Sequence, residues 1–285
     1  MKKLTVNLKY DNKKLNTFIL NSFPNLKNNT LFKALRQKDI KINGKRVHEN
    51  VVIHNGDEIE IFISDDLLLG NTNLNIIYED DNILIINKPS GIAVTENSKS
   101  CITLTSLVKN QFGQNVEPCH RLDLNTTGLI IFAKNKPSLD ILLQKFKNRE
   151  IEKHYEATVL GKMPYKHEIL TAYLFKDSKK SLVYISDVPQ KNYTKIITEY
   201  TVLNYDATTN TSTLDIILHT GKTHQIRAHL AHIGHPIIGD GKYGINEINK
   251  KFKKSTQMLC SNKIIFNFTT NSGLLTYLNG KTIQL

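Results

Sequence analysis

The stretch His120–Asn135, HRLDLNTTGLIIFAKN, joins a polar loop to an apolar run. A basic pair precedes Asp123, turn-forming residues follow it, and TGLIIFAKN has the composition of a buried strand. A carboxylate in such a loop can belong to an ordinary surface turn, or it can be a reactive group held in place. The surrounding sequence has to decide between these interpretations.

From Leu74 onward, strand patterns outnumber helical ones. LNIIYEDDNILIINKPSG predicts a hairpin that turns at residues 80–82, and SLDILLQKFKN has the apolar spacing of a helix. Further strands are predicted at HYEATVLG, TEYTVLNY and STLDIILH. Because most neighbours look antiparallel, we predict an α+β protein in which residues 74–285 form a domain of catalytic size around a mixed, mostly antiparallel sheet.

The N-terminal residues predict a second, smaller α+β domain over residues 1–70, with a linker in SDDLLLGNTN (residues 64–73). LFKALRQ has the pattern of a short helix, and the strands IKINGKRV and NGDEIEIFI follow it, each with an Asn-Gly turn signal. A basic ridge is expected from Lys33, Arg36, Lys38, Lys41, Lys45 and Arg46.

The composition favours a polyanionic partner. The 38 Lys and Arg residues exceed the 26 Asp and Glu residues, so the formal charge is +12, and a surplus of this size is typical of nucleic-acid binding. A Lys-rich genome composition would give a similar number. The three dispersed cysteines indicate neither a disulfide framework nor a metal knuckle, which predicts a reducing, cytoplasmic location. The sequence shows no export signal and no membrane span.

The stretch HTGKTHQIRAHLAHIGHPIIGD (residues 219–240) predicts a strand end, a turn and a helix from His224 to Ile233 that stops at Gly234. Ile226, Leu230 and Ile233 would form its buried stripe, with Arg227 beside that stripe. A charge so placed usually has a partner. Asp123 is the partner we expect, because a nearby guanidinium keeps a carboxylate ionised for nucleophilic or basic chemistry.

Taken together, these motifs resemble the RluA family of pseudouridine synthases, which acts mostly on large-subunit ribosomal RNA and on some transfer RNAs. The resemblance runs from the basic N-terminal domain, which looks like an S-four-like RNA-binding domain, through INKPSGIAV, HRLDLNTTGLIIFAKN, KHYEATVLG and HTGKTHQIRAHL to GHPIIGD. It implies the two-domain α+β fold described above, an RNA partner and an isomerase activity.

The resemblance also implies roles for individual residues. Asp123 matches the catalytic aspartate, Tyr155 the active-site tyrosine, and Arg227 the arginine that pairs with the aspartate. Ile226 matches the aliphatic residue beneath the target base. Arg121 matches a basic residue that helps to displace the flipped base.

Further residues are expected on the substrate side, namely His120, Lys222 and Lys88. Lys222 stands where arginine is common in the family, which keeps the charge but loses the fork geometry. Lys88, with Pro89, is expected to brace the catalytic loop and not to react. The resemblance further implies RNA contacts by Lys33, Arg36, Lys38, Lys45 and Arg46.

The implied reaction breaks the bond from ribose to a ring nitrogen of uracil and rejoins the base through carbon 5, so no cofactor or metal is expected. The uridine must first leave its stack, at a cost of a few kcal/mol. Asp123 could attack the ribose, attack the base, or remove a ribose proton, and the sequence leaves these routes open. Tyr155 could stack on the base and take up the proton from carbon 5.

Two other functions fit the sequence in part: a non-catalytic RNA-binding or ribosome-assembly factor, and an isomerase that acts on transfer RNA. A metal site is not expected from His224, His229, His232 and His235, because HEXXH and similar spacings are absent. We also expect a monomer that binds neither DNA nor membranes.

Overall fold

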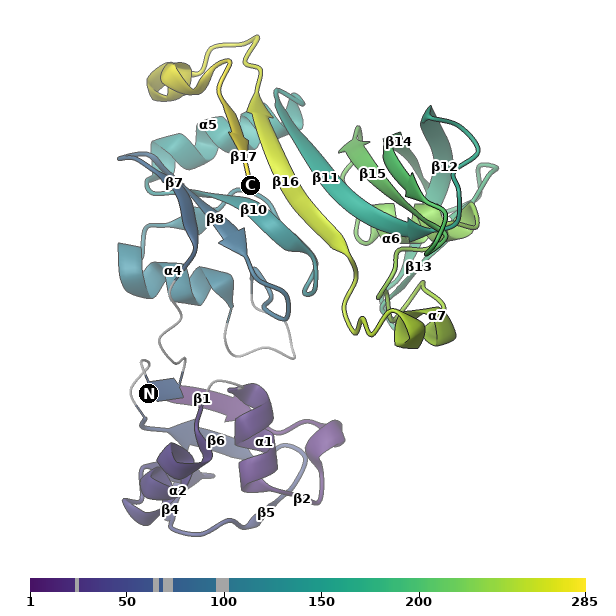
Figure 1. Ribbon diagram of the computed structural model, residues 1–285. Coiled ribbons are helices and arrows are strands. Elements are labelled where there is room, and N and C mark those ends of the chain that lie inside the picture. The colour runs from purple at the N-terminus through teal and green to yellow at the C-terminus, as the bar shows by residue number, and fades with distance from the viewer. Residues whose placement is uncertain (24–25, 64–66, 69–73, 96–102) are drawn as a thin grey trace. The chain divides into compact units, whose positions relative to one another are not determined.

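The computed structural model describes residues 1–23, 26–63, 67–68, 74–95 and 103–285 (Figure 1). The chain divides into two compact units, Met1–Asn73 with Thr95–Gln111 and Leu74–Val94 with Phe112–Leu285. The linker predicted at residues 64–73 lies outside the described residues, apart from Leu67 and Leu68. No helix in the described ranges is long and apolar enough to cross a membrane.

The first unit contains a four-stranded sheet in the order β1-β6-β3-β4, formed by Lys2–Thr5, Glu58–Ile61, Ile40–Ile42 and Lys45–Val47. A two-stranded ribbon pairs β2 (Lys13–Lys14) with β5 (Val52–Ile53). The helices are η1 (Leu8–Tyr10), α1 (Leu15–Ser22), α2 (Asn28–Arg36) and most of α4 (Leu104–Phe112). Asn43 and Gly44 both have positive φ (50° and 78°), which makes the tight turn between β3 and β4.

The second unit is built on an eleven-stranded sheet with the order β13-β12-β14-β15-β11-β16-β10-β8-β7, to which β17 adds beside β16 and β9 beside β10. Along the chain its strands are Ile76–Glu79, Ile83–Lys88, Glu117–Pro118, Thr127–Ala133, Ile151–Leu160, His167–Asp177, Leu182–Ser186, Thr194–Asp206, Thr211–Leu218, Leu259–Phe266 and Thr282–Gln284 (β7 to β17). Among the described strands, all pairs in this sheet are antiparallel except β10 with β16. The predicted α+β class with a mixed, mostly antiparallel sheet is therefore confirmed.

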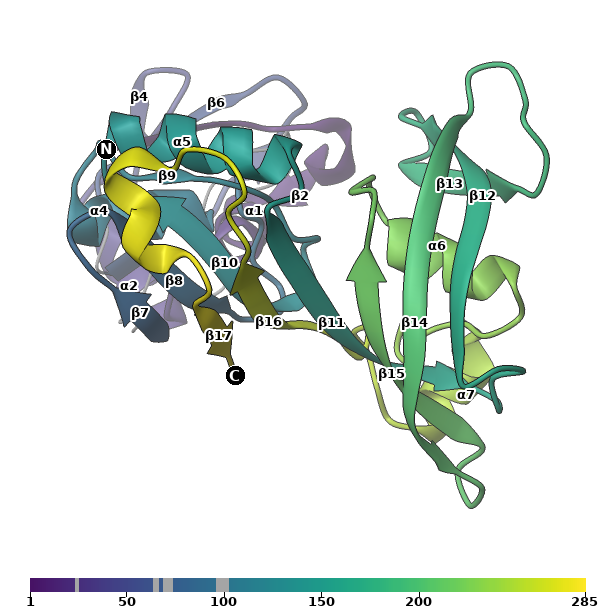
Figure 2. The same ribbon diagram turned by 90° about the horizontal axis from the view of Figure 1, so that it is seen from above.

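Two apolar clusters hold helices against this sheet (Figure 2). Helix α5 (Lys136–Lys147) starts where the Asn135 side chain accepts a hydrogen bond from the Ser138 N–H, and its Leu142 is buried with residues of β8, β10 and β16. Helix α6 (Gln225–His232) buries Ala228 with Ala172, Val183 and Ile196 of the sheet. Helix α7 (Asn246–Lys251) and the 3-10 helix η2 (Gly273–Leu278) complete the unit.

Helix α6 differs from the amphipathic helix predicted there, because Gln225 to Leu230 are all buried. Its polar residues are satisfied inside the protein: the Gln225 side chain donates to the Ile197 carbonyl at 3.1 Å, and the His229 Nδ1 atom lies 3.0 Å from the Thr198 Oγ1 atom. Arg227, expected at the edge of the buried stripe, is itself only 6% exposed. Polar contacts with β14 thus override the local pattern.

Candidate active site

Asp123 lies in the loop between β9 and β10, and hydrogen bonds from the buried ammonium of Lys88 hold this loop in place. Lys88 Nζ donates to the carbonyls of Pro89, Ile92 and Leu124, each at 2.9 Å. Burial lowers the pKa of Lys88 to about 8, although the negative charge of Asp123 acts to raise it. Because these contacts use its three N–H donors, the structure supports the expected bracing role and shows no free donor of Lys88 for a substrate.

Gly128 marks the start of β10, where the chain passes close to β16. Its φ is +106°, and a Cβ atom added there would overlap the backbone of its strand partner Ser261. Only glycine meets both conditions without strain. The glycine that ends HRLDLNTTG thus fixes how the Asp123 loop enters the sheet.

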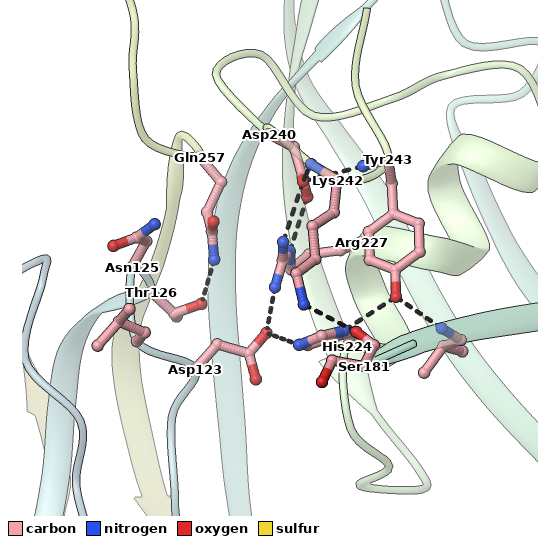
Figure 3. A network of polar contacts seen from close by, with 12 residues as sticks. Asp123, Asn125, Thr126, Ser181, His224, Arg227, Asp240, Lys242, Tyr243 and Gln257 are labelled. Atoms are coloured by element: carbon pink, nitrogen blue, oxygen red, sulfur yellow. Dashed lines mark hydrogen bonds and ion pairs between the residues drawn. The ribbon is translucent and has the colours of Figure 1, made fainter. Parts of the chain in front are cut away.

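The Asp123 carboxylate is paired with Arg227 of α6, and Arg227 is in turn paired with Asp240 (Figure 3). Arg227 Nη1 donates to Asp123 Oδ2 at 2.9 Å, while Nε and Nη2 donate to the two oxygens of Asp240 at 2.7 and 3.0 Å. The side chain of Asp123 is 25% exposed, that of Arg227 7% and that of Asp240 0%. The predicted pairing of Asp123 with Arg227 is present, and it forms the accessible end of a buried chain of charges.

Asp240 holds these paired charges in place because backbone N–H groups donate hydrogen bonds to its side chain. Its Oδ1 atom accepts the N–H groups of Lys242 at 2.8 Å and Tyr243 at 3.1 Å. Burial alone would raise the pKa of Asp240, but the hydrogen bonds and charge of Arg227 hold it below its usual value. For Arg227, burial acts to lower the pKa, and the contacts with Asp240 and then Asp123 raise it above its usual value. Asp240 and Arg227 therefore both stay ionised.

His224 faces Asp123 from the other side, with its Nε2 atom 3.9 Å from Asp123 Oδ2 (Figure 3). The Tyr243 hydroxyl accepts the Val183 N–H at 2.9 Å and lies 2.9 Å from His224 Nδ1. Burial lowers the pKa of His224 to about 4, partly offset by Asp123. The ring is therefore neutral at physiological pH. His224 itself has a left-handed backbone, with φ 54°.

Tyr155 and Ile226, both predicted at the site, are buried, at 4% each. Tyr155 lies on β11 opposite Ser261, directly after a register shift between β11 and β16. Such a bulge re-aims the following side chain. Among the described residues, the Tyr155 hydroxyl has no hydrogen-bond partner. Ile226 precedes Arg227 in α6.

The remaining predicted substrate residues differ in exposure. Arg121 and Lys222 are exposed, and no described residue pairs with either side chain. His120 is packed inside: its Nε2 atom accepts the Ile131 N–H at 3.1 Å, and its ring lies 5.0 Å from that of Phe146. Burial lowers the pKa of His120 well below its usual value. His120 therefore supports the loop, whereas Arg121 and Lys222 are open to a ligand.

The cations predicted to bind RNA in the first unit are exposed. They are Lys33 and Arg36 of α2, Lys38, and Lys45 and Arg46 of β4. Arg46 Nη1 donates to the Lys38 carbonyl at 2.6 Å. Lys41 is half-buried and lies 3.6 Å from Glu60.

Within the described ranges, no group of three or more His, Cys, Asp or Glu side chains is arranged to hold a metal ion. The four histidines near α6 have separate contacts: His224 with Tyr243, His229 with Thr198, His232 with Asp187, and His235 with the Leu160 carbonyl.

Sequence patterns indicated no role for Asp240, Tyr243 or the orientation of His224. Asp240 closes the motif GHPIIGD, and Gly239 before it has φ +83° and no room for a Cβ beside the Thr256 backbone. A buried guanidinium has five donors that one carboxylate cannot satisfy, so the burial of Arg227 requires a second acid. Because this burial was not predicted, the sequence did not point to Asp240.

Comparison with known proteins agrees with this geometry. A family model described as RNA pseudouridylate synthase matches residues 82–232, more than half of the chain. The ribosomal large subunit pseudouridine synthase C of Rickettsia bellii is 35% identical over 254 residues, which cover 82% of this chain and 84% of that protein. The mitochondrial tRNA pseudouridine(32) synthase of Saccharomyces cerevisiae is 31% identical over 243 residues, covering 84% of this chain and 52% of that protein.

The solved structure of human RNA pseudouridylate synthase domain containing 1 shares the fold, with a TM-score of 0.60, 24% identity, and coverage of 70% of this chain and 80% of that one. The family model and the relatives define the class of the chain as an RNA-modifying isomerase. The chain belongs to the RNA pseudouridylate synthase family, as its motifs predicted, and it is an RNA pseudouridine synthase.

Proposed function

We propose that this enzyme converts specific uridines of large-subunit ribosomal RNA to pseudouridine, with Asp123 as the catalytic residue. The observation that carries the proposal is the Asp123 carboxylate itself: Oδ2 is held 2.9 Å from the buried Arg227, and Oδ1 has no hydrogen-bond partner among the described residues. One oxygen is held in place by the guanidinium, and the other is left to react.

The reaction is balanced within the substrate. The bond between N1 and C1′ breaks, a bond between C5 and C1′ forms, the proton on C5 leaves, and N1 takes up a proton. Asp123 acts on the ribose or the ring during these steps, and Arg227 holds its carboxylate in place. Tyr155 stacks on the base and receives the C5 proton.

The target uridine has to leave its helix or stack before Asp123 can reach it. Exposed Arg121, two residues before Asp123, replaces the extruded base, and Ile226 forms the wall beneath it. Lys222 contacts the RNA backbone as a point charge. The exposed cations of the first unit bind folded RNA by charge and shape.

Ribosomal RNA is the substrate favoured by the relatives named for the large ribosomal subunit, which cover most of this chain. Transfer RNA is the second candidate, supported by the similarity to the yeast tRNA enzyme. A purely RNA-binding or assembly role is disfavoured because Asp123, Tyr155 and Arg227 are all present. We also propose a monomer that acts in the cytoplasm and does not bind DNA.

Mapping pseudouridine in RNA from a deletion strain tests the proposal. We expect carbodiimide and primer extension to show positions in large-subunit ribosomal RNA that lose pseudouridine in the strain. A plasmid copy of the wild-type protein should restore them, and the Asp123→Ala variant should not. Loss confined to transfer RNA would move the substrate to the second candidate, and restoration by Asp123→Ala would overturn the catalytic role.

A further inference from the structure

Lys153 of β11 lies beside Tyr155, and the mechanism above does not use it. Its Nζ atom is 6.0 Å from the centroid of the Tyr155 ring and 5.4 Å from that of Phe146, at the end of α5. Lys153 lies two residues before Tyr155 on β11, and the distance between its ammonium and the tyrosine ring places the two side chains next to each other. The lysine therefore lies one strand repeat away from a proposed substrate contact.

The ammonium of Lys153 has no anionic partner in the described part of the chain. Its neighbour Glu152 points to the opposite face, where it lies 2.7 Å from His154. Glu150 is already paired with Lys145, whose Nζ atom lies 2.6 Å from Glu150 Oε2. Lys153 is nonetheless half-buried, and a half-buried ammonium usually finds a carboxylate, as Lys134 does with Glu79 at 2.9 Å.

The charge of Lys153 also reaches the loop that carries Asp123. Burial lowers the pKa of His120 the most, and the positive charge of Lys153 lowers it further. His120 lies three residues before Asp123, and its ring packs on Phe146 at 5.0 Å. The cation is thus next to the substrate loop on one side and to Tyr155 on the other.

We propose that Lys153 binds a backbone phosphate of the RNA strand next to the target nucleotide. A phosphate oxygen supplies the anion that the protein lacks there, and a charge-assisted contact is strongest at a partly desolvated site. Lysine suits a phosphate as a compact point charge, while the two rings hold its alkyl chain. This inference rests on the proposed function, since it requires an RNA strand in the site.

The matched control for this position is Lys263. It is a half-buried lysine of the neighbouring strand β16, and it lies opposite His154 of β11 in the strand register. Because successive residues alternate between faces, Lys263 points to the face opposite Lys153. Changing Lys263 to glutamine removes the same charge from the same part of the sheet without removing the proposed phosphate contact.

The test measures binding and turnover of RNA isolated from a deletion strain grown with 5-tritiated uridine. We expect Lys153→Gln to raise the Kd about tenfold and to lower the slope of log Kd against log salt by about 0.7–0.9, with an unchanged rate at saturating enzyme. Lys153→Arg should restore both binding values. Lys153→Met, which keeps the contacts with the rings, should match Lys153→Gln, and Lys263→Gln should match the wild type.

An unchanged Kd and salt slope for Lys153→Gln would overturn the inference while leaving the proposed function intact. So would a slower saturated rate with unchanged Kd, which would make Lys153 a packing residue for Tyr155. If the wild-type protein released no tritium from this RNA, the proposed substrate would fail, and this inference with it.

Discussion

The two units present their cations in opposite ways. In the second unit, Arg227 is buried and its guanidinium is shared between Asp123 and Asp240. In the first unit, the proposed RNA-binding cations, such as Lys33 and Arg36, are exposed on α2. A buried, fully paired charge fixes geometry and is costly to disturb, whereas exposed charges add screened, adaptable attraction. We propose that the first unit takes part in RNA docking but not in the chemistry, whereas the second unit carries the chemistry and the RNA contacts beside it.

The largest expected effect comes from removing the buried partner of Arg227. Asp240→Ala leaves a buried guanidinium with Asp123 alone, and we expect it to lower the free energy of unfolding by about 3–5 kcal/mol. Chemical denaturation measures the change. The control is Asp187→Asn, since Asp187 is an exposed acid that pairs with His232 and with no other residue in the described part of the chain. A loss below about 1 kcal/mol for Asp240→Ala would contradict the picture of a buried ionic centre.

The second effect concerns the entry of the Asp123 loop into the sheet. We expect Gly128→Ala to cost about 3 kcal/mol, because both the positive φ and the overlap with Ser261 must be relieved. Gly113→Ala is the matched control: Gly113 has a similar φ of +96° but nothing within 4 Å of an added Cβ, so only about 1 kcal/mol of strain should appear. Equal losses in the two variants would show that the close approach to β16 is unimportant.

The third effect is a pH dependence of the second unit's stability. Burial lowers the pKa of His229 to about 4, whereas an unfolded histidine titrates near 6.5. As pH falls through this window, the unfolded state binds a proton that the folded state does not, so stability decreases. We expect His229 to contribute a loss of about 2 kcal/mol between pH 7 and pH 5.

Unfolding by urea at several pH values checks this contribution. His229→Asn should reduce the pH dependence between pH 7 and pH 5 by about 2 kcal/mol and leave the contributions of His120 and His224 in place. His48→Asn in the first unit should leave the dependence as in the wild type. If His229→Asn kept the full wild-type dependence, the titration would have to come from other groups.

The smallest effect is expected in the first unit. Changing both Lys33 and Arg36 to glutamine should weaken RNA binding a few-fold at physiological salt and reduce the salt slope by about 1 for each lost phosphate contact. The saturated turnover rate should not change. Lys9→Gln is the control, since Lys9 is exposed in the same unit and lies over Tyr10. A fall in saturated rate, with no change in Kd, would break the separation of docking from chemistry.

Local patterns predicted the elements that have a clear apolar period. The observed hairpin of β7 and β8, strand β10 and helix α5 lie close to the predicted residues, because each has a turn or cap signal at its ends. The burial of α6 was not predicted. Polar residues such as Gln225 and His229 normally indicate an exposed face, but here both side chains contact Thr198 of β14, and Gln225 also accepts a hydrogen bond from Thr220.

The candidate site shows the same limit. Asp123 and Arg227 were paired on the basis of motifs, and their ion pair is present. Asp240 and Tyr243 reach the site through the turns after α6, where no periodic pattern indicates a direction. Their contacts depend on backbone N–H groups and on glycines with positive φ. These are features of the folded backbone, and a single sequence does not show them.

The most direct test of the central claim is the single-turnover rate of tritium release by Asp123→Asn at saturating enzyme. Asparagine nearly preserves the shape of the side chain but removes its charge, and Arg227 keeps Asp240. We predict a rate at least about 10²-fold below that of the wild type, with unchanged RNA affinity. A rate equal to that of the wild type or of Asp187→Asn would contradict the claim that Asp123 is the reacting group.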